Sequence, residues 1–447
     1  MSDEPVPGRP SSIKRAFGAY ANREVPAEDV RLTHVGPGTP CGEYLRRFWQ
    51  PVGHTKDLKD LPVPIRIMGE DLVLFRDRAG RVGLLQRQCC HRGTSLEFGL
   101  IAERGIRCCY HGWLFDVDGT ILETPAEPET SRLKDLLFQG AYPTREYSGL
   151  VFAYMGPSEP PPPFPQLDMF EVPGYRLEPG DPEQNIKPCN WLQVQDNVLD
   201  IGHETFLHAR SSGLQINDAG GRPLAALADL PELDFFETPI GVLCTSTRRV
   251  GHSIWVRGLE HIAPNIAQIP RTPALPPAYA PGTDRITVRP RATRWRVPVD
   301  DYHTLELSLV RVREGEANTY SKQASLARRS NYGDRPFEER QRFPGDYDAQ
   351  VSQRAIARHG LEHLASTDRG VALFRRQLRR GIDAVAEGKE PAESLRAFPA
   401  RTYGFETLVR RSPANDAAAD RQLLHDTTRR LVEARLRGEG SDLPVVI

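Results

Sequence analysis

The stretch CCHRGTSLEFGLIAERGIRCCYHGW, which runs from Cys89 to Trp113, contains two short groups of potential metal ligands. The first group has the pattern C-x-H and the second has the pattern C-x-x-H, with sixteen residues between them. Each group offers one thiolate and one imidazole, and both side chains are common metal ligands. The stretch therefore predicts a metal centre that is built from two loops.

Two kinds of centre use two sulfur and two nitrogen ligands, a tetrahedral zinc ion and a Rieske [2Fe–2S] cluster. In a Rieske cluster one iron binds two cysteines and the other binds two histidines. Each loop must then give one residue to each iron, and the tip of a single loop can direct both side chains at a pair of irons. Zinc sites usually place like ligands together, as C-x2–4-C and H-x3–5-H. The spacing therefore favours the cluster over zinc.

The spacing also selects which cysteines are ligands. Cys90 directly precedes His91, and the side chains of neighbouring residues in an extended loop tip point apart. The predicted ligands are Cys89, His91, Cys108 and His111. The thiols of Cys90 and Cys109 are then expected to be buried or to lie next to the ligands.

Length and composition limit the class of protein. A chain of 447 residues is too long for one compact core and suggests two domains. The charges of the 58 basic and 59 acidic residues nearly cancel, so the net charge does not indicate binding to nucleic acid or to an anionic membrane. No apolar run approaches the roughly 18 residues that a membrane span needs.

The cellular location is expected to be cytoplasmic. The N-terminus, Met1 to Pro10, is polar and rich in proline, unlike a signal peptide. Seven cysteines in a chain of this length do not make a disulfide framework, and four of them lie in the two ligand loops. This usage fits a reducing compartment with a metal role for some thiols.

Local patterns divide the chain into three parts. Residues 1–40 are expected to form an N-terminal arm that packs on a catalytic domain, with a short helix between Ser12 and Tyr20. Residues 41–157 contain short β patterns with glycine and aspartate at the joints, as in a small antiparallel domain. The proline run Pro160–Pro163 cannot pair in a sheet and marks the boundary to residues 158–447.

A second group of potential ligands has the pattern D-x-x-H-x-x-x-x-H at Asp200, His203 and His208. Two imidazoles and one carboxylate form the facial triad of non-haem Fe(II) oxygenases. On a regular α-helix the two histidines, five residues apart, would differ by about 140° and could not reach one iron. We therefore predict a π-bulge, a break or a helix end between them.

Together these motifs resemble the oxygenase α subunits of Rieske non-haem iron oxygenases. The family motifs C-x-H-R-G and C-x-Y-H-G-W match the first stretch, except that proline often stands where this chain has Cys90, which leaves Cys90 as an alternative ligand. Residues Gly36–Pro51 resemble the opening of the phthalate-dioxygenase branch, G-P-G-T-P-x-G-E-Y-L-R-R-x-W-x-P. The resemblance covers nearly the whole chain.

The resemblance implies a fold and a set of site residues. The fold is α+β, with a small antiparallel-β Rieske domain and a larger helix-grip domain in which a curved sheet and helices enclose a mononuclear iron. His203 and His208 would be iron ligands, and Asp200 would be a carboxylate that links an iron-bound histidine to a Rieske histidine of the next subunit. The third ligand would be Asp346, by alignment of the following segment, with Asp348 as the alternative.

The resemblance also implies the activity, that of the terminal oxygenase of a multicomponent system. The chain would use O2 to hydroxylate or demethylate an aromatic or related ring substrate, often a carboxylate, as a dioxygenase or monooxygenase. Electrons would come from NAD(P)H through a separate reductase or ferredoxin, because the chain has no Rossmann fingerprint. A homotrimer or hexamer is expected. A basic helix over residues 368–388 offers a docking patch for the reductase, with an ordinary solvated face as the alternative.

Two other classes of protein remain as alternatives. A Rieske electron-transfer protein would use the cluster without oxygenase activity, although most of the chain would then have no role. A zinc-stabilised binding protein would use both histidines of the second group only as structural residues.

Overall fold

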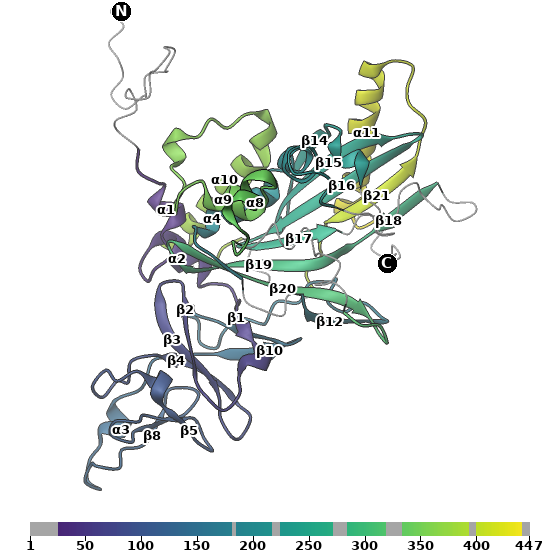
Figure 1. The fold of residues 1–447 in the computed structure, drawn as a ribbon. Helices are drawn as coiled ribbons and strands as arrows, with labels where there is room; N and C mark the ends of the chain where they lie inside the picture. Colours follow the sequence, from purple (N-terminus) through teal and green to yellow (C-terminus); the bar gives the residue numbers. More distant parts are fainter. Residues whose placement is uncertain are drawn as a thin grey trace, which may run out of the picture.

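The computed structural model describes residues 26–180, 185–216, 224–270, 284–318, 333–392 and 399–439. The chain combines a small unit of short antiparallel strands with a large antiparallel sheet that carries helices (Figure 1). This arrangement confirms the predicted α+β fold class. The short helix expected between Ser12 and Tyr20 lies outside the described residues.

The small unit consists of three antiparallel sheets. The strands of each sheet are given in spatial order. The first sheet contains β1 (Gln50–His54), β11 (Leu150–Ala153) and β10 (Thr144–Tyr147), and the second contains β2 (Val63–Ile67), β3 (Glu70–Arg76), β4 (Val82–Gln86) and β9 (Ala141–Tyr142). The third sheet contains β5 (Leu100–Ile101), β6 (Ile106–Arg107), β7 (Leu114–Phe115) and β8 (Ile121–Glu123). A short helix, α3 (Leu133–Leu136), follows β8. Val73 and Phe75 of β3 share a buried core with Cys89, Cys108 and Trp113, so the ligand loops are built onto this core.

The large sheet has ten strands, and seven of them form its main path. Their spatial order is β12 (Tyr175–Pro179), β20 (His303–Arg313), β19 (Pro290–Asp300), β17 (Ile266–Pro270), β16 (Ser253–Ile262), β15 (Gly241–Val250) and β14 (Glu232–Thr238). The other three are β13 (Asn185–Lys187) on β20, β21 (Phe405–Arg410) on β16, and β18 (Arg285–Val288) on β21. This large antiparallel sheet agrees with the sheet that the resemblance implies for the larger domain.

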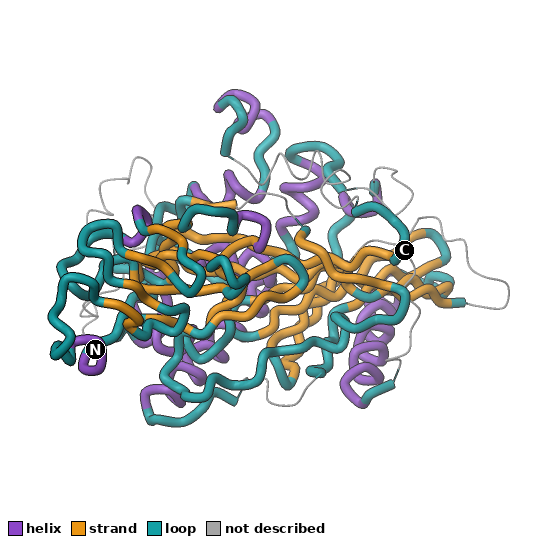
Figure 2. Tube along the Cα trace, turned by 90° about the horizontal axis from the view of Figure 1, so that it is seen from below, coloured by secondary structure: helices purple, strands orange, loops and turns teal. Residues whose placement is uncertain are grey.

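Helices cover both faces of this sheet (Figure 2). Along β15, Val242 and Cys244 belong to the core that contains Phe374 of α10 (Arg369–Ala386), and the intervening Leu243 belongs to the core under α11 (Ala417–Arg437). This alternation follows from the two-residue period of a strand. The other described helices are α1 (Val30–Thr33), α2 (Pro40–Leu45), α4 (Trp191–Leu199), α5 (His203–Thr205), α8 (Phe337–Arg342) and α9 (Asp346–Val351). In the described part of the chain, no helix has the length and apolarity that crossing a membrane requires.

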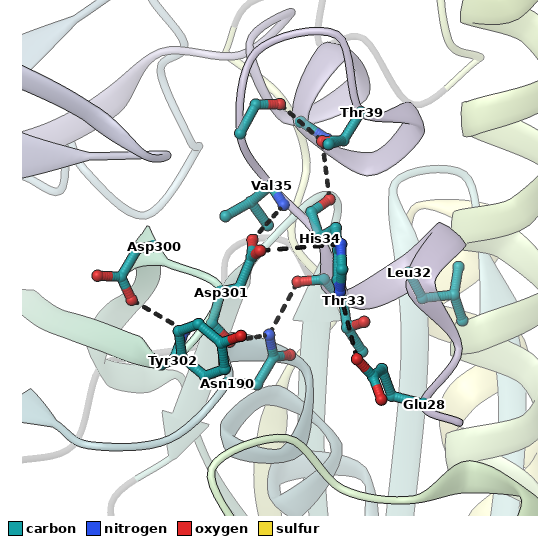
Figure 3. A network of polar contacts seen from close by, with 12 residues as sticks. Glu28, Leu32, Thr33, His34, Val35, Thr39, Asn190, Asp300, Asp301 and Tyr302 are labelled. Atoms are coloured by element: carbon teal, nitrogen blue, oxygen red, sulfur yellow. Dashed lines mark hydrogen bonds and ion pairs between the residues drawn. The ribbon is translucent and has the colours of Figure 1, made fainter. Parts of the chain in front are cut away.

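The described N-terminal segment is fastened to the large unit by Asn190, which is fully buried (Figure 3). The side-chain oxygen of Asn190 accepts a hydrogen bond from the Leu192 amide and so caps the start of α4. Its amide nitrogen donates to the carbonyl oxygens of Thr33 at 2.8 Å and Asp301 at 2.7 Å. One side chain therefore joins the N-terminal segment, the β19–β20 turn and the helix that leads to Asp200.

Candidate metal centres

The two ligand loops have the same backbone construction. The amide of Gly93 donates to the Cys89 carbonyl at 2.8 Å, and the amide of Gly112 donates to the Cys108 carbonyl at 3.1 Å. Both glycines have positive φ angles, 76° and 74°, which are strained for residues with a side chain. Each cysteine thus begins a tight turn that returns the chain within four residues.

These turns bring the four predicted ligands together. The thiols of Cys89 and Cys108 are buried and contact each other, and burial together with the neighbouring thiol raises the pKa of Cys89 to about 12. The rings of His91 and His111 are only partly covered, with centroids 4.7 Å apart, and His91 stacks on Trp113. Two buried sulfurs below two outward imidazoles fit a cluster with a cysteine-bound inner iron and a histidine-bound outer iron. A metal supplies the positive charge that buried thiolates need.

The thiols of Cys90 and Cys109 are exposed, so the expectation of burial is wrong for both. The thiol of Cys90 nevertheless lies next to the predicted ligands, because it interacts electrostatically with the thiols of Cys89 and Cys108. Each is the second residue of the tight turn that the buried cysteine before it begins, and the turn leaves its side chain accessible to solvent. The first loop is held instead by Gln139, which is fully buried. Its oxygen accepts from the Cys90 amide at 2.7 Å, and its nitrogen donates to the carbonyls of Gln86, at the end of β4, and Gln88, just before the loop. Gln139 belongs to no motif and was not predicted.

The second group of ligands lies on a helix that changes type. The helix α4 ends before Asp200, α5 begins at His203, and Phe206–Arg210 forms a π-helix in which the Ser211 amide donates to the Phe206 carbonyl at 2.7 Å. The predicted π-type irregularity is therefore confirmed. Because its hydrogen bonds span five residues, the π-helix widens the turn after α5, and the rings of His203 and His208 lie with centroids 5.2 Å apart.

Asp346, the first residue of α9, faces both histidines. Its Oδ1 lies 3.6 Å from Nε2 of His203 and 3.3 Å from Nε2 of His208, and one potential ligand atom of each residue lies within 4.8 Å of the others. Asp348, the alternative, points elsewhere: it pairs with Arg335 at 2.7 Å and Arg340 at 2.6 Å. Two imidazoles and a carboxylate in this arrangement suit Fe(II) with open positions for other ligands.

Charge makes this group receptive to a metal ion. Burial disfavours a charged His208, but the Asp346 carboxylate outweighs burial and raises the pKa of His208 to about 9. Burial also opposes ionisation of Asp346, yet the pKa of Asp346 lies far below its usual range because His208 and His203 stabilise the carboxylate. Without metal, a proton on His208 thus neutralises the carboxylate, and a bound cation would take the place of that proton.

The helix turn that carries the histidines is anchored by a buried ion pair. Glu204, which follows His203, pairs with Arg257 on β16, and both side chains are about 95% buried. Burial raises the pKa of Glu204, but Arg257 and Arg248 more than compensate, so the carboxyl group stays ionised. This pair fastens the turn that carries His203 and His208 to strand β16 of the sheet.

Asp200 lies beside His203 but differs from the expected geometry. Its backbone carbonyl, and not its carboxylate, accepts the hydrogen bond from Nδ1–H of His203. The carboxylate is largely buried, and burial raises its pKa although His203 opposes this shift. It lines a cavity of about 470 Å³ that also includes His203, Asn197 and Arg354. The amide of Asn197 lies 3.5 Å from Asp346.

The basic helix does not form a free cationic patch. Arg375 pairs with Asp196 and Glu362, both at 2.5 Å. The three other arginines of this face also contact carboxylates of the same chain, Arg376 and Arg380 at Glu237 and Arg379 at Asp29. Their charges are therefore compensated within the chain, which favours the ordinary solvated face over a docking patch.

Comparisons with known proteins agree with this geometry. Residues 48–139 match the family model of the Rieske [2Fe-2S] domain. The tert-butanol monooxygenase / tert-amyl alcohol desaturase oxygenase subunit of Aquincola tertiaricarbonis is 42% identical over 435 residues, which are 91% of this chain and 89% of the relative. The phenoxybenzoate dioxygenase subunit alpha of Ectopseudomonas oleovorans is 40% identical, over 85% of this chain and 90% of the relative.

A solved structure shows the same fold. The NdmA protein of Pseudomonas putida CBB5 in complex with caffeine superposes with a TM-score of 0.57, covering 85% of this chain and 99% of that protein, at 17% sequence identity. At this identity the likeness concerns the fold alone.

Proposed function

Because this chain belongs to the oxygenase subunits of the Rieske non-haem iron oxygenases, we propose that it oxidises an aromatic or related ring substrate, with an aromatic carboxylate as the favoured class. The chain is the terminal oxygenase component, it carries a [2Fe–2S] cluster and a mononuclear iron, and it works with a separate reductase or ferredoxin. The convergence of His203, His208 and Asp346 carries the proposal, since neither an electron carrier nor a zinc-stabilised binding protein needs such a group.

The proposed residue roles follow from the donor chemistry. Cys89 and Cys108 hold one iron of the cluster and His91 and His111 hold the other, and the two histidines and the aspartate of the second centre hold the mononuclear iron. When bound, that iron supplies the position at which O2 is activated with electrons from the cluster. The protein directs each Nε2 of the second centre inward, because each Nδ1–H is already engaged by another group.

We also propose that electrons cross between subunits of a homotrimer or hexamer, with Asp200 as the link. In Figure 1 the ligand loops beside β5 and β8 lie at one end of the molecule, far from α4 and α9. This separation supports electron transfer from the cluster of another subunit. Several large apolar side chains near these loops are exposed and suit an interface: Phe98, Leu100, Tyr110, Leu136 and Phe138. The cavity beside Asp200 is the place where the histidines of the next subunit's ligand loops would enter.

The domain division is proposed as an arm over residues 1–40, a Rieske domain over 41–157 and a catalytic domain over 158–447. Pairing of β1 with β11 supports the second of these, because it closes the small unit between residues 50 and 153. Contacts of α1 with α4 and α10 support an arm that packs on the catalytic domain. A reducing, cytoplasmic location is also proposed, supported by seven unpaired cysteines.

Replacing Asp200 with Asn should leave the cluster absorbance and the iron content unchanged but lower turnover by about 10- to 100-fold, because the proposed link would lose the negative charge that lies next to His203. The amide keeps the size and the backbone carbonyl but removes the negative charge. Asp383→Asn, on the exposed face of α10, is the control and should retain full turnover. Full activity of Asp200→Asn would contradict the linking role.

The substrate proposal is tested by measuring O2 uptake, NADH oxidation and product formation with a surrogate reductase. The panel contains phenoxybenzoate, phthalate, a methoxybenzoate and tert-butanol, since relatives of both aromatic and aliphatic type exist. We expect coupled uptake and an oxidised product with at least one aromatic acid. Turnover of tert-butanol alone would place the chain with aliphatic substrates, and no coupled uptake with any compound would contradict the proposal.

A further inference from the structure

The two histidines of the second centre are held at Nδ1 by different groups. His203 donates to a backbone carbonyl of its own helix segment, so its orientation follows from the local backbone. His208 donates to the side chain of Gln215, whose Oε1 lies 3.0 Å from Nδ1 of the ring. Because this partner is a side chain, the orientation of His208 depends on the identity of residue 215.

Gln215 is fixed on both sides of its contact with His208. Its backbone amide donates to the carbonyl of His208 at 2.9 Å, so the loop folds back on the end of the π-helix. Its side-chain nitrogen lies 3.4 Å from the carbonyl oxygen of Pro344, which also accepts from Oγ of Ser212 at 2.6 Å. Pro344 stands two residues before Asp346 in the sequence. The segment 211–216 therefore joins the π-helix to the segment that carries the third ligand.

The hydrogen-bond pattern determines the tautomer of His208. A carbonyl oxygen of Pro344 can only accept, so the amide nitrogen of Gln215 must face it and the amide oxygen must face the ring. The ring then carries its hydrogen on Nδ1, so Nε2, which faces Asp346 at 3.3 Å, is the nitrogen left to bind a metal ion in place of a proton. An apolar side chain at position 215 would leave both Nδ1–H and the ring orientation without support.

We propose that Gln215 is a positioning residue of the mononuclear iron site, which sets the tautomer and orientation of His208 and connects it through Pro344 to Asp346. The inference rests on the proposed function, in that the second centre must bind Fe(II). No role of this kind follows from the ligand motif, because Gln215 stands in the loop after it. The effect should be visible in metal affinity even in the absence of substrate and reductase.

The test is the dissociation constant for Fe(II), measured anaerobically on protein that retains its cluster. Wild type is compared with Gln215→Leu, which removes both side-chain contacts, and Gln215→Glu, which keeps an acceptor for Nδ1–H. Gln422→Leu, on the exposed face of α11, is the matched control. Cluster absorbance and Tm are recorded for each variant, and the EPR spectrum of the ferrous nitrosyl complex reports the geometry at the iron.

We expect Gln215→Leu to bind Fe(II) about 10- to 100-fold more weakly than wild type, with an altered nitrosyl spectrum and an unchanged cluster. Gln215→Glu should recover most of the affinity, and Gln422→Leu should behave as wild type. Equal affinity of wild type and Gln215→Leu would overturn the inference. So would an equal loss in both Gln215 variants together with a lower Tm, since that pattern indicates a purely structural role. If wild type itself binds no Fe(II), the proposed function fails as well.

Discussion

Replacing Asp346 with Ala is expected to empty the mononuclear iron site, to leave the cluster absorbance intact and to abolish detectable product formation. Asp346 is the only carboxylate of the ligand group found in the described residues, and its negative charge, which raises the pKa of His208, would equally stabilise a bound metal ion. Without it, two neutral imidazoles remain, which hold Fe(II) poorly. Turnover should fall at least about 100-fold, the upper end of what losing an outer partner of a ligand costs.

Asp348→Ala is the matched control for this variant, because the residue stands two positions away on the same helix. It should lose the pairs with Arg335 and Arg340 and show a lower Tm, but it should still bind Fe(II). Iron content, measured after anaerobic reconstitution, separates the two variants. If Asp348→Ala loses the iron and Asp346→Ala keeps it, the assignment of the third ligand is reversed.

Replacing Cys108 with Ser is expected to remove the cluster and its brown absorbance, together with both sulfides and two irons per chain. The buried thiol of Cys108 contacts that of Cys89, and the turn closed at Gly112 places Cys108, and not the adjacent Cys109, in the buried position. Electron delivery to the mononuclear iron then stops, so turnover should disappear although Fe(II) still binds there.

Cys109→Ser provides the comparison on the adjacent residue. The side chain of Cys109 is exposed, and the substitution should leave absorbance, sulfide content and turnover close to wild type. Absorption spectra and acid-labile sulfide of the two variants decide the matter. Loss of the cluster in Cys109→Ser with retention in Cys108→Ser would show that the spacing rule selects the wrong thiol.

Local spacing explains what could be predicted from the sequence. The C-x-H and C-x-x-H groups each lie within one turn, so their geometry depends on a few neighbouring residues. The irregular helix between His203 and His208 was predictable for the same reason, because five residues on an α-helix cannot place two side chains on one metal. Alignment of the segment that follows Asp346 favours this residue over Asp348 as the third ligand, and the structure brings Asp346 to the two histidines.

Long-range contacts explain what could not be predicted. Gln139 binds a loop that lies about fifty residues before it in the sequence, and Gln215 stands in the loop after the ligand motif. Neither glutamine belongs to a motif, so the sequence alone does not indicate that it binds a ligand loop or a ligand. The arginines of α10 resembled a docking patch because their partners, Glu237 and Asp29, lie more than a hundred residues away. Whether the backbone carbonyl or the carboxylate of Asp200 accepts the hydrogen bond from His203 depends on the backbone geometry at the end of α4, and the sequence does not reveal that geometry.

The most direct test is the iron and acid-labile sulfide content of anaerobically purified protein, with its absorption spectrum. A chain that holds both centres should contain about three irons and two sulfides and should show the absorbance of a Rieske cluster. Zinc without sulfide would contradict both centres. Two irons with two sulfides, and no further uptake of added Fe(II), would contradict the mononuclear site formed by His203, His208 and Asp346.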